Sequence, residues 1–360
     1  MVHLQVQEYP HFSDSNSSMT IISSIILGFF LTACLAITCR DENNRPVDWF
    51  FVYKLPILQD FPELKDGFGY AYFDAHSHKP ELVPSTKSLK DPMSLSYTLA
   101  PLYTPNKSKM AFGMYNDDPP FGSASSGYGH VKGTLATDDQ SGYWLIHSTP
   151  RFPFNSTDSY EFPDFAKIYG QTFICISFSV REFDKIGQAL QIMRPKFYET
   201  HVPVHLKDKL PQVDAAFDGS YENSPRSLDL SLFSLGGEMF RHLSKTGKWG
   251  KCIYEHLVSP TLKADLYVEN WMRPWIDSFC PPKYDYTNLN VKEISFGGGR
   301  DFGYTKDHSK WAITPGNDWV CIGDMNRMTS QYKRGGGAMC LKNPVLHRAF
   351  KGIVKELDKC

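Results

Sequence analysis

The stretch Tyr304-Thr-Lys-Asp-His308-Ser-Lys310-Trp-Ala-Ile-Thr314 decides how this chain is interpreted. In an extended segment alternate side chains share a face, so we expect His308 and Lys310 to point the same way, about 7 Å apart. An imidazole and an ammonium group at this spacing suit a phosphate group. One His-x-Lys pattern alone carries little weight, because both residues are common on solvated strand faces.

A second copy of the pattern occurs at Tyr128-Gly-His130-Val-Lys132-Gly-Thr-Leu. Each copy is followed by an extended stretch, a turn and an aromatic strand, which contains Trp144 in the first copy and Trp319 in the second. Such self-similarity indicates an internal repeat. We therefore predict a mixed α/β domain over residues 39–360, built from a half at 39–205 and a half at 206–360.

Two imidazoles brought to one phosphodiester can hydrolyse it without a metal or cofactor. One neutral imidazole attacks phosphorus, and the other, protonated, donates to the leaving oxygen. We assign these catalytic roles to His130 and His308, while Lys132 and Lys310 hold the non-bridging oxygens. The sequence does not decide which histidine is the nucleophile, and a bell-shaped pH profile is expected.

The N-terminal 38 residues read as an extension followed by a signal peptide. They contain no Lys or Arg, and an apolar run of 17 residues from Ile21 to Ile37 ends among small residues. Met19 is a possible start of translation. A retained membrane anchor is the alternative, because 17 residues is the lower limit for a span.

Cysteine usage and sequons agree with export. Once Cys34 is removed with the signal, seven cysteines remain, so at most three bridges form and one thiol is left over. No Cys-x-x-Cys pair occurs, which disfavours structural zinc. Asn106-Lys-Ser and Asn155-Ser-Thr are N-glycosylation sequons.

The net charge of the chain indicates a binding partner only at acid pH. The chain has 38 basic and 39 acidic residues, and residues 1–38 hold two of the acids, so the remainder carries 38 minus 37, or +1. Ten of its twelve histidines also lie there, since only His3 and His11 precede residue 39. Near pH ~5 most unperturbed histidines protonate, and a cationic protein binds polyanions by counterion release.

Local patterns predict the following elements. We expect strands at 47–55, 69–74, 109–115, 171–180, 265–271 and 291–296, and helices at 183–193, 233–243 and 344–357, the last capped by Asn343. The region 196–230 is interpreted as the connection between the halves, and 331–340 as a basic glycine loop. The histidine pairs His76/His78 and His201/His205 are interpreted as loop residues rather than metal ligands.

Taken together, the longer motifs resemble the deoxyribonuclease II family. They are Pro46-Val-Asp-Trp-Phe-Phe-Val-Tyr-Lys-Leu-Pro56, Gly129-His-Val-Lys-Gly133, Trp144-Leu-Ile-His-Ser148, Asp307-His-Ser-Lys-Trp311 and Thr329-Ser-Gln-Tyr-Lys-Arg-Gly-Gly-Gly337. The resemblance implies a lysosomal or secreted acid endonuclease that needs no metal and leaves 3′-phosphate ends on DNA. It also implies a phospholipase D-like fold, whose two pseudo-symmetric halves carry mixed β-sheets flanked by helices. The superfamily aspartate five positions after each lysine is missing, since Thr137 and Pro315 stand there.

The resemblance further implies phosphate contacts from His147, Ser148 and Asn326. The bridges it implies are Cys39–Cys175, Cys280–Cys360 and Cys321–Cys340, which leaves Cys252 as the odd thiol. The expected partner is DNA, without metal or stable membrane association after signal cleavage, and with a monomer or homodimer as the assembly. Two other functions stay open: a non-catalytic polyanion-binding paralogue on the same scaffold, and a phospholipase D-like lipid phosphodiesterase.

Overall fold

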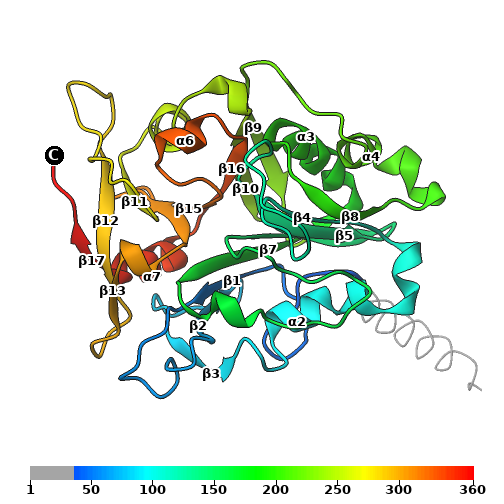
Figure 1. Cartoon of the computed structure of the whole chain (residues 1–360), viewed down its shortest axis with the longest axis horizontal. Coiled ribbons are helices and arrows are strands. Elements are labelled where there is room, and N and C mark those ends of the chain that lie inside the picture. The colour runs from blue at the N-terminus through cyan, green and yellow to red at the C-terminus, as the bar shows by residue number, and fades with distance from the viewer. Residues whose placement is uncertain (1–35) are drawn as a thin grey trace, which may run out of the picture. The chain divides into compact units, whose positions relative to one another are not determined.

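The computed structural model describes residues 36–360, and the expected extension and signal lie outside them apart from 36–38. The described strands form two sheets, one from each part of the chain (Figure 1). The first sheet has the order β3 (Pro84–Ser88), β2 (Gly69–Asp74), β1 (Trp49–Lys54), β7 (Gln171–Ser179), β6 (Ser141–His147), β5 (Lys132–Thr137), β4 (Ala111–Asn116) and β8 (Phe197–His201). All of its strand pairs are antiparallel.

The second sheet is formed by the strands after residue 226. Its order is β13 (Asp301–Gly303), β12 (Asn288–Ser295), β11 (Leu266–Asn270), β14 (Lys310–Ile313), β15 (Trp319–Gly323), β16 (Gly336–Lys342), β10 (Met239–Lys245) and β9 (Ser227–Phe233), and β17 (Val354–Leu357) pairs with β12. The β11–β12 pair is parallel. The described α-helices are α2 (Ser94–Leu99), α3 (Phe183–Met193), α4 (Pro211–Phe217), α5 (Ser259–Leu262), α6 (Thr329–Tyr332) and α7 (Pro344–Ile353).

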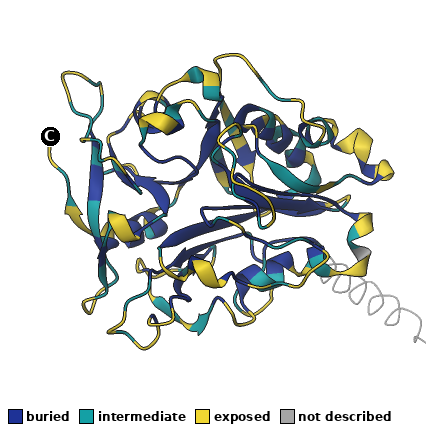
Figure 2. Cartoon of the chain, viewed as in Figure 1, coloured by how far each residue is buried: buried dark blue, intermediate teal, exposed yellow. Residues whose placement is uncertain are grey.

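One apolar core joins the two sheets. It contains Trp49, Phe51 and Ile176 from the first sheet together with Trp311 and Met339 from the second. The helices α3 and α7 contribute to the same core. Figure 2 shows that the central strands are buried along their length, as their continuous apolar sequences predict. This shared core places the two halves in one fixed body, so residues from both can build a single site.

Each sheet has a second apolar layer on its other face. Segments around α2 and residues 152–166 cover the first sheet, and residues 252–264 cover the second. Three disulfides are present, Cys39–Cys175, Cys280–Cys360 and Cys321–Cys340, and Cys252 is free and buried. They are the pairs that the resemblance implies. Among residues 36–360, no helix is both long enough and apolar enough to cross a bilayer.

The helix expected at 233–243 is wrong. Strands β9 and β10 form an antiparallel hairpin there, with Phe233 opposite Met239. Gly237 has a φ of 89°, a left-handed conformation that glycine adopts readily and that ends regular structure. The apolar residues on either side of this turn mimic a helical period but lie on separate strands.

Three other expectations need correction. The final helix begins at Pro344 with the Asn343 side chain as its cap, as expected, but ends at Ile353 because residues 354–357 pair with β12. The expected glycine loop is instead helix α6 followed by β16, an interior strand of the sheet. The connection at 196–230 contains strand β8 and helix α4, so it is part of the folded body.

Candidate active site between the two halves

The two His-x-Lys motifs occupy equivalent places in the two sheets. Lys132 is the first residue of β5 and Lys310 the first residue of β14, and both are buried. His130 and His308 therefore lie just before the strands, and not within them as the sequence suggested. Each motif begins where a loop enters a rigid strand, a position that fixes the lysine firmly and leaves the histidine at the edge.

Each histidine is anchored to the opposite half by its backbone. The N–H of His130 donates to the carbonyl oxygen of Gly335 at 2.8 Å, and the N–H of His308 donates to that of Gly170 at 2.9 Å. The reciprocal pattern brings the two motifs to the junction of the halves. Their charges interact there: Lys132 lowers the pKa of His308, and Lys310 lowers the pKa of His130.

Both imidazoles are held neutral in the unliganded site. Burial lowers the pKa of His308 to about 3, and the charges of Lys310 and Lys132 add to the shift. Burial also lowers the pKa of His130 well below its ordinary value, followed by the charge of Lys132. Two desolvated imidazoles beside two lysines form an environment that favours a bound anion.

The ring of His130 has a defined tautomer. Its Nδ1 lies 2.6 Å from the carbonyl oxygen of Asp324. A carbonyl oxygen only accepts hydrogen bonds, so Nδ1 carries the proton and Nε2 of the neutral ring keeps its lone pair. His130 is thereby prepared to act as a nucleophile or base.

The ring of His308 is held by aromatic stacking instead. Tyr169 stacks on it with a centroid distance of 3.9 Å and an interplanar angle of 9°, and Trp271 lies 5.0 Å away at 53°. The Nε2 atom is buried and has no hydrogen-bond partner among the described residues. The two rings thus differ in how they are fixed.

A buried network positions the His308 segment. The carboxylate of Asp307 accepts a hydrogen bond from the Tyr53 hydroxyl, and bonds of 2.8 Å from both the N–H and the hydroxyl of Ser309. The Trp311 indole N–H donates to the Tyr53 hydroxyl at 3.1 Å. Because Tyr53 belongs to β1, this network connects the first sheet to the second directly beneath His308.

An ion-pair cluster that the sequence did not indicate holds the first motif. Lys132 Nζ donates to one carboxylate oxygen of Asp117, and Arg334 Nη2 donates to the other at 2.9 Å. Burial alone raises the pKa of Asp117, but the combined interactions with Lys132, His130 and Arg334 outweigh it and hold this pKa below its ordinary value. The sequence offered only two weak signals, a turn containing Asp117 and a basic glycine segment containing Arg334.

Arg334 also fixes the loop before His130. Its guanidinium donates to the carbonyl oxygens of Tyr128 at 3.0 Å, Gly129 at 2.9 Å and Ser125 at 3.1 Å. All three belong to the first half, whereas Arg334 belongs to the second. The planar five-donor guanidinium suits this many acceptors, and lysine would not replace it.

Asp324 is the other acid that sequence reasoning missed. It is buried, and its Oδ2 accepts a hydrogen bond of 3.1 Å from the N–H of Gly337, whereas Oδ1 has no partner among the described residues. Burial raises its pKa to about 7, although the nearby charges of Lys132 and Lys310 oppose the shift. A carboxyl group that changes charge near neutrality therefore lies beside both lysines.

The three expected phosphate contacts lie in the interior. His147 is stacked on Phe173 at 5.5 Å, and burial lowers its pKa to about 3. The Ser148 hydroxyl donates to Gln171 Oε1 at 2.5 Å. Asn326 is buried, and its side-chain oxygen has no partner among the described residues. Their contact with phosphate stays a prediction.

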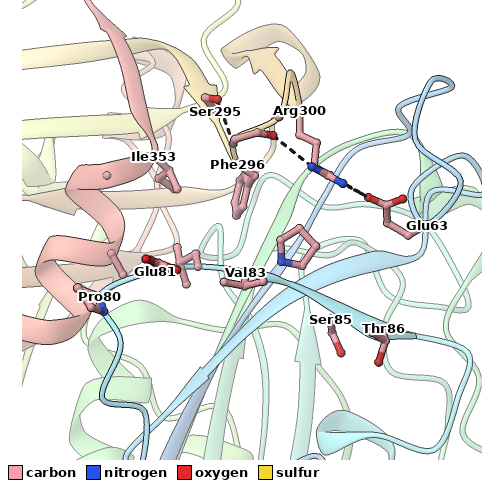
Figure 3. A pocket seen from close by; sticks show the side chains of 16 residues that line it. Glu63, Pro80, Glu81, Val83, Ser85, Thr86, Ser295, Phe296, Arg300 and Ile353 are labelled. Carbon is pink, nitrogen blue, oxygen red and sulfur yellow. Dashed lines mark hydrogen bonds and ion pairs between the residues drawn. The ribbon is translucent and has the colours of Figure 1, made fainter.

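A separate pocket contains neither motif. It has a volume of about 700 Å³ and lies between β3, the loop after β12 and helix α7. Figure 3 shows Arg300 turned toward Glu63, with which it forms a salt bridge of 2.6 Å. Because this pair neutralises itself and Glu81 adds a negative charge, the pocket lacks the positive charge that a phosphodiester requires.

No described group of three or more His, Cys, Asp or Glu side chains is arranged to hold a metal ion. His76 and His78 are exposed, and His201 lies 3.2 Å from the Ser108 carbonyl oxygen. These histidines therefore lie outside the paired motifs and do not form a site with them.

Comparison with known proteins gives consistent matches over this body. The family model of deoxyribonuclease II matches residues 38–360. Plancitoxin-1 from Acanthaster planci is 40% identical over 354 residues, which cover 95% of this chain and 97% of that protein. Deoxyribonuclease-2-alpha from Rattus norvegicus is 36% identical over 353 residues, covering 95% and 100%, and cell death-related nuclease 6 from Caenorhabditis elegans is 34% identical over 342 residues, covering 90% of each.

Proposed function

The chain belongs to the deoxyribonuclease II family, and from this premise we propose that it is an acid endodeoxyribonuclease acting through a phosphohistidine. The observation that carries the proposal is the reciprocal anchoring of His130 and His308 at the junction of the halves. Two imidazoles and two buried lysines there match what hydrolysis of a phosphodiester requires.

In the proposed first step, Nε2 of His130 attacks phosphorus. The bond from phosphorus to the 5′ oxygen breaks, and His308 donates a proton to that oxygen, which leaves as a 5′-hydroxyl. Lys132 and Lys310 stabilise the charge on the non-bridging oxygens. The defined Nδ1–H tautomer of His130 supports its assignment as the nucleophile.

In the second step, water replaces the histidine. His308, now neutral, accepts a proton from water, which attacks phosphorus and breaks the phosphorus–nitrogen bond. The product is a 3′-phosphate end, and His308 is again protonated. Atoms and charges balance without a metal or cofactor.

The acid requirement follows from the same groups. With the site empty, the two lysines oppose protonation of His308. A bound phosphodiester is anionic, so it offsets the lysine charges and raises the pKa of His308. Binding substrate therefore takes up a proton, and acid makes this uptake easier.

We propose that the protein acts in the lysosome or is secreted. The three disulfides support this, because such bonds persist in oxidising compartments. Asn155 lies in a partly exposed position, and glycosylation at Asn106 and Asn155 stays a prediction. A mass shift on treatment with a glycosidase would test it.

The test is plasmid nicking in chelator at about pH 5, where unperturbed histidines are protonated. Wild type is compared with His130→Ala, His308→Ala and the matched control His78→Ala, which changes an exposed histidine. We expect nicking by wild type and the control only. Full activity in either catalytic-site variant would contradict the paired-imidazole mechanism, and DNA retardation by wild type without cleavage would favour a binding protein instead.

A further inference from the structure

A groove of about 390 Å³ adjoins the His130 side of the site. Its walls come from five separate parts of the chain: residues 127–129, Ile192 with Arg194, residues 222–223, residues 246–248 with Gly250, and residues 333–335. Two wall residues also belong to the site's framework. Gly129 directly precedes His130, and Arg334 binds the carboxylate that pairs with Lys132. The groove therefore adjoins the loop that carries His130.

Close packing of the backbone forms the end of this groove nearest His130. A Cβ atom added at Gly129 or Gly335 would lie 2.1 Å from the Met193 carbonyl oxygen, closer than any real contact. Glycine is required at both positions, so the wall is made of peptide groups. Side chains that would fill the groove are excluded here.

The groove has uncompensated positive charge. Arg194, Lys248 and Lys333 are exposed and line it, and none forms an ion pair with another described residue. The acid in the wall, Glu222, is paired with Arg226 at 3.5 Å. Three free cations around a small hollow favour a phosphate group, which carries a negative charge along every nucleic-acid backbone.

An aromatic platform lies beside the cations. The Arg194 guanidinium lies 5.7 Å from the ring centre of Tyr128 and 5.8 Å from that of Tyr221. The Tyr221 hydroxyl donates to the Pro195 carbonyl oxygen at 2.9 Å, which fixes its ring. An arginine next to tyrosine rings beside a cationic groove is typical of binding sites for unpaired bases.

We propose that this groove binds the nucleotide next to the scissile phosphodiester on the same DNA strand. Its phosphate contacts Lys248 and Lys333, and its base lies on the Arg194–Tyr128 platform. The volume is at the lower end of small-molecule sites, roughly 300–1,000 Å³, which suits one nucleotide. This inference rests on the proposed function and names the substrate contacts of the same site.

The test uses charge removal at two exposed positions. The double variant Lys248→Gln/Lys333→Gln is compared with Lys65→Gln/Lys209→Gln, which removes the same charge from exposed lysines that do not line the groove. Two substrates distinguish an effect on the groove from an effect on the catalytic centre. One is a single-stranded oligonucleotide, and the other is bis(p-nitrophenyl) phosphate, whose single phosphodiester has no neighbouring nucleotide.

We expect kcat/KM on the oligonucleotide to fall about tenfold in the groove variant, as for the loss of one or two charge-assisted contacts. The dependence of log kcat/KM on log salt should lose a slope of about 0.7, the value for one phosphate of a single strand. Turnover of the small diester should match that of the control. The same charge changes in a His308→Ala background should raise the Kd for the oligonucleotide by about tenfold, measured by fluorescence anisotropy.

Each other outcome overturns the inference. If the two double variants have equal oligonucleotide kinetics and equal Kd values, the groove has no role in substrate binding. Cleavage by wild type would still support the proposed function in that case. Loss of small-diester turnover in the groove variant alone would show that these lysines act on the catalytic centre. If wild type cleaves neither substrate, the proposed function itself fails, and the anisotropy comparison still decides whether the groove binds DNA.

Discussion

Lys132 and Lys310 occupy the same place in the two halves, each as the first residue of a strand, but their neighbours differ. Lys132 is paired with Asp117, which also binds Arg334. Lys310 has no described carboxylate within ion-pair distance, and its Nζ donates to the His308 carbonyl oxygen at 2.6 Å. Burial lowers the pKa of Lys310 to about 7, and the charge of Lys132 adds to this shift.

The carboxyl groups beside the two motifs differ in the same way. Asp117 is ionised and hydrogen-bonded by two cations. Glu269, on the strand paired with β14, is buried without a hydrogen-bond partner in residues 36–360, and burial raises its pKa well above the ordinary value. The two His-x-Lys units therefore have equivalent places at the starts of β5 and β14, whereas their different neighbours give each unit a different charge state.

The largest effect should distinguish the two histidines. A p-nitrophenyl leaving group departs without a proton, so it needs no general acid. If His130 is the nucleophile and His308 the acid, His308→Ala should lose about 10³-fold on DNA but far less on a p-nitrophenyl phosphodiester. His130→Ala should lose activity on both. The reverse pattern would exchange the two roles, and trapping of the phosphoenzyme with peptide mapping provides an independent readout.

The carboxyl groups can be compared with matched amide substitutions. Asp117→Asn leaves the buried Lys132 and the partly buried Arg334 without their counter-charge and should lower the free energy of unfolding by about 3 kcal/mol. Glu269→Gln replaces an acid that is already neutral near pH 5, so we expect a change within about 1 kcal/mol. Urea denaturation at that pH measures both. Similar losses in the two variants would mean that the charge difference between the halves is not real.

The local sequence was sufficient to predict a helix or strand where the residues of that element alone determine its structure. The apolar run from Gln171 predicted the central strand β7, and the Asn343-Pro344 pair predicted the start of α7. The local sequence gave wrong predictions where pairing with a segment elsewhere in the chain determines the structure. Residues 354–357 leave the helical pattern because β12 is available for pairing, and Phe233 lies in a strand because the Gly236-Gly237 turn permits a hairpin.

The candidate site, like the fold, was predictable only where its residues are close together in the sequence. The two His-x-Lys units were visible because each is contiguous in sequence. The Asp117–Arg334 pair was not, since its members are 217 positions apart and nothing in either segment indicates that they are paired. Likewise, nothing local indicates that Asp324 is buried beside both lysines. Repeats reveal what the halves share, and only the tertiary structure reveals how they differ.

Each half also buries a histidine outside its motif, and His242 offers the next test. It is fully buried against Trp144, its ring nitrogens have no hydrogen-bond partner in the described part of the chain, and burial lowers its pKa from 6.5 to about 3. As the pH falls below 6.5, His242 binds a proton in the unfolded chain but stays neutral in the folded protein. The free energy of unfolding therefore decreases.

Replacing His242 by leucine removes this penalty. At about pH 5 the gain relative to about pH 7.5 should be roughly 2 kcal/mol, because the penalty grows by about 1.36 kcal/mol for each pH unit below the ordinary pKa of 6.5. Taking the difference in the free energy of unfolding between the two pH values removes any effect of altered packing that is the same at both. Urea denaturation of His242→Leu and of the exposed control His78→Leu measures it, and an equal pH dependence in all three proteins would show that His242 titrates normally.

The smallest expected effect concerns Asp324, which faces Lys132, Lys310, Asp117 and the N–H of Gly337. With its pKa near 7, it is neutral in acid and becomes an anion beside the phosphate site as the pH rises. Asp324→Asn keeps the backbone carbonyl that binds His130 but cannot ionise. Its activity at about pH 8, relative to that at about pH 5, should exceed the wild-type ratio by up to tenfold, because only about a tenth of the wild-type acid is still protonated.

Lys310 also loses its charge near neutrality, so the Asp324→Asn profile should still decline, but later and less steeply than that of wild type. Initial rates on DNA across the pH range, at constant ionic strength, measure both limbs. If the two profiles superimpose, the alkaline limb belongs to Lys310 and the imidazoles alone. A shifted limb would instead assign part of the acid preference to a carboxyl group that the first half does not possess at the corresponding place, where Ser148 follows strand β6.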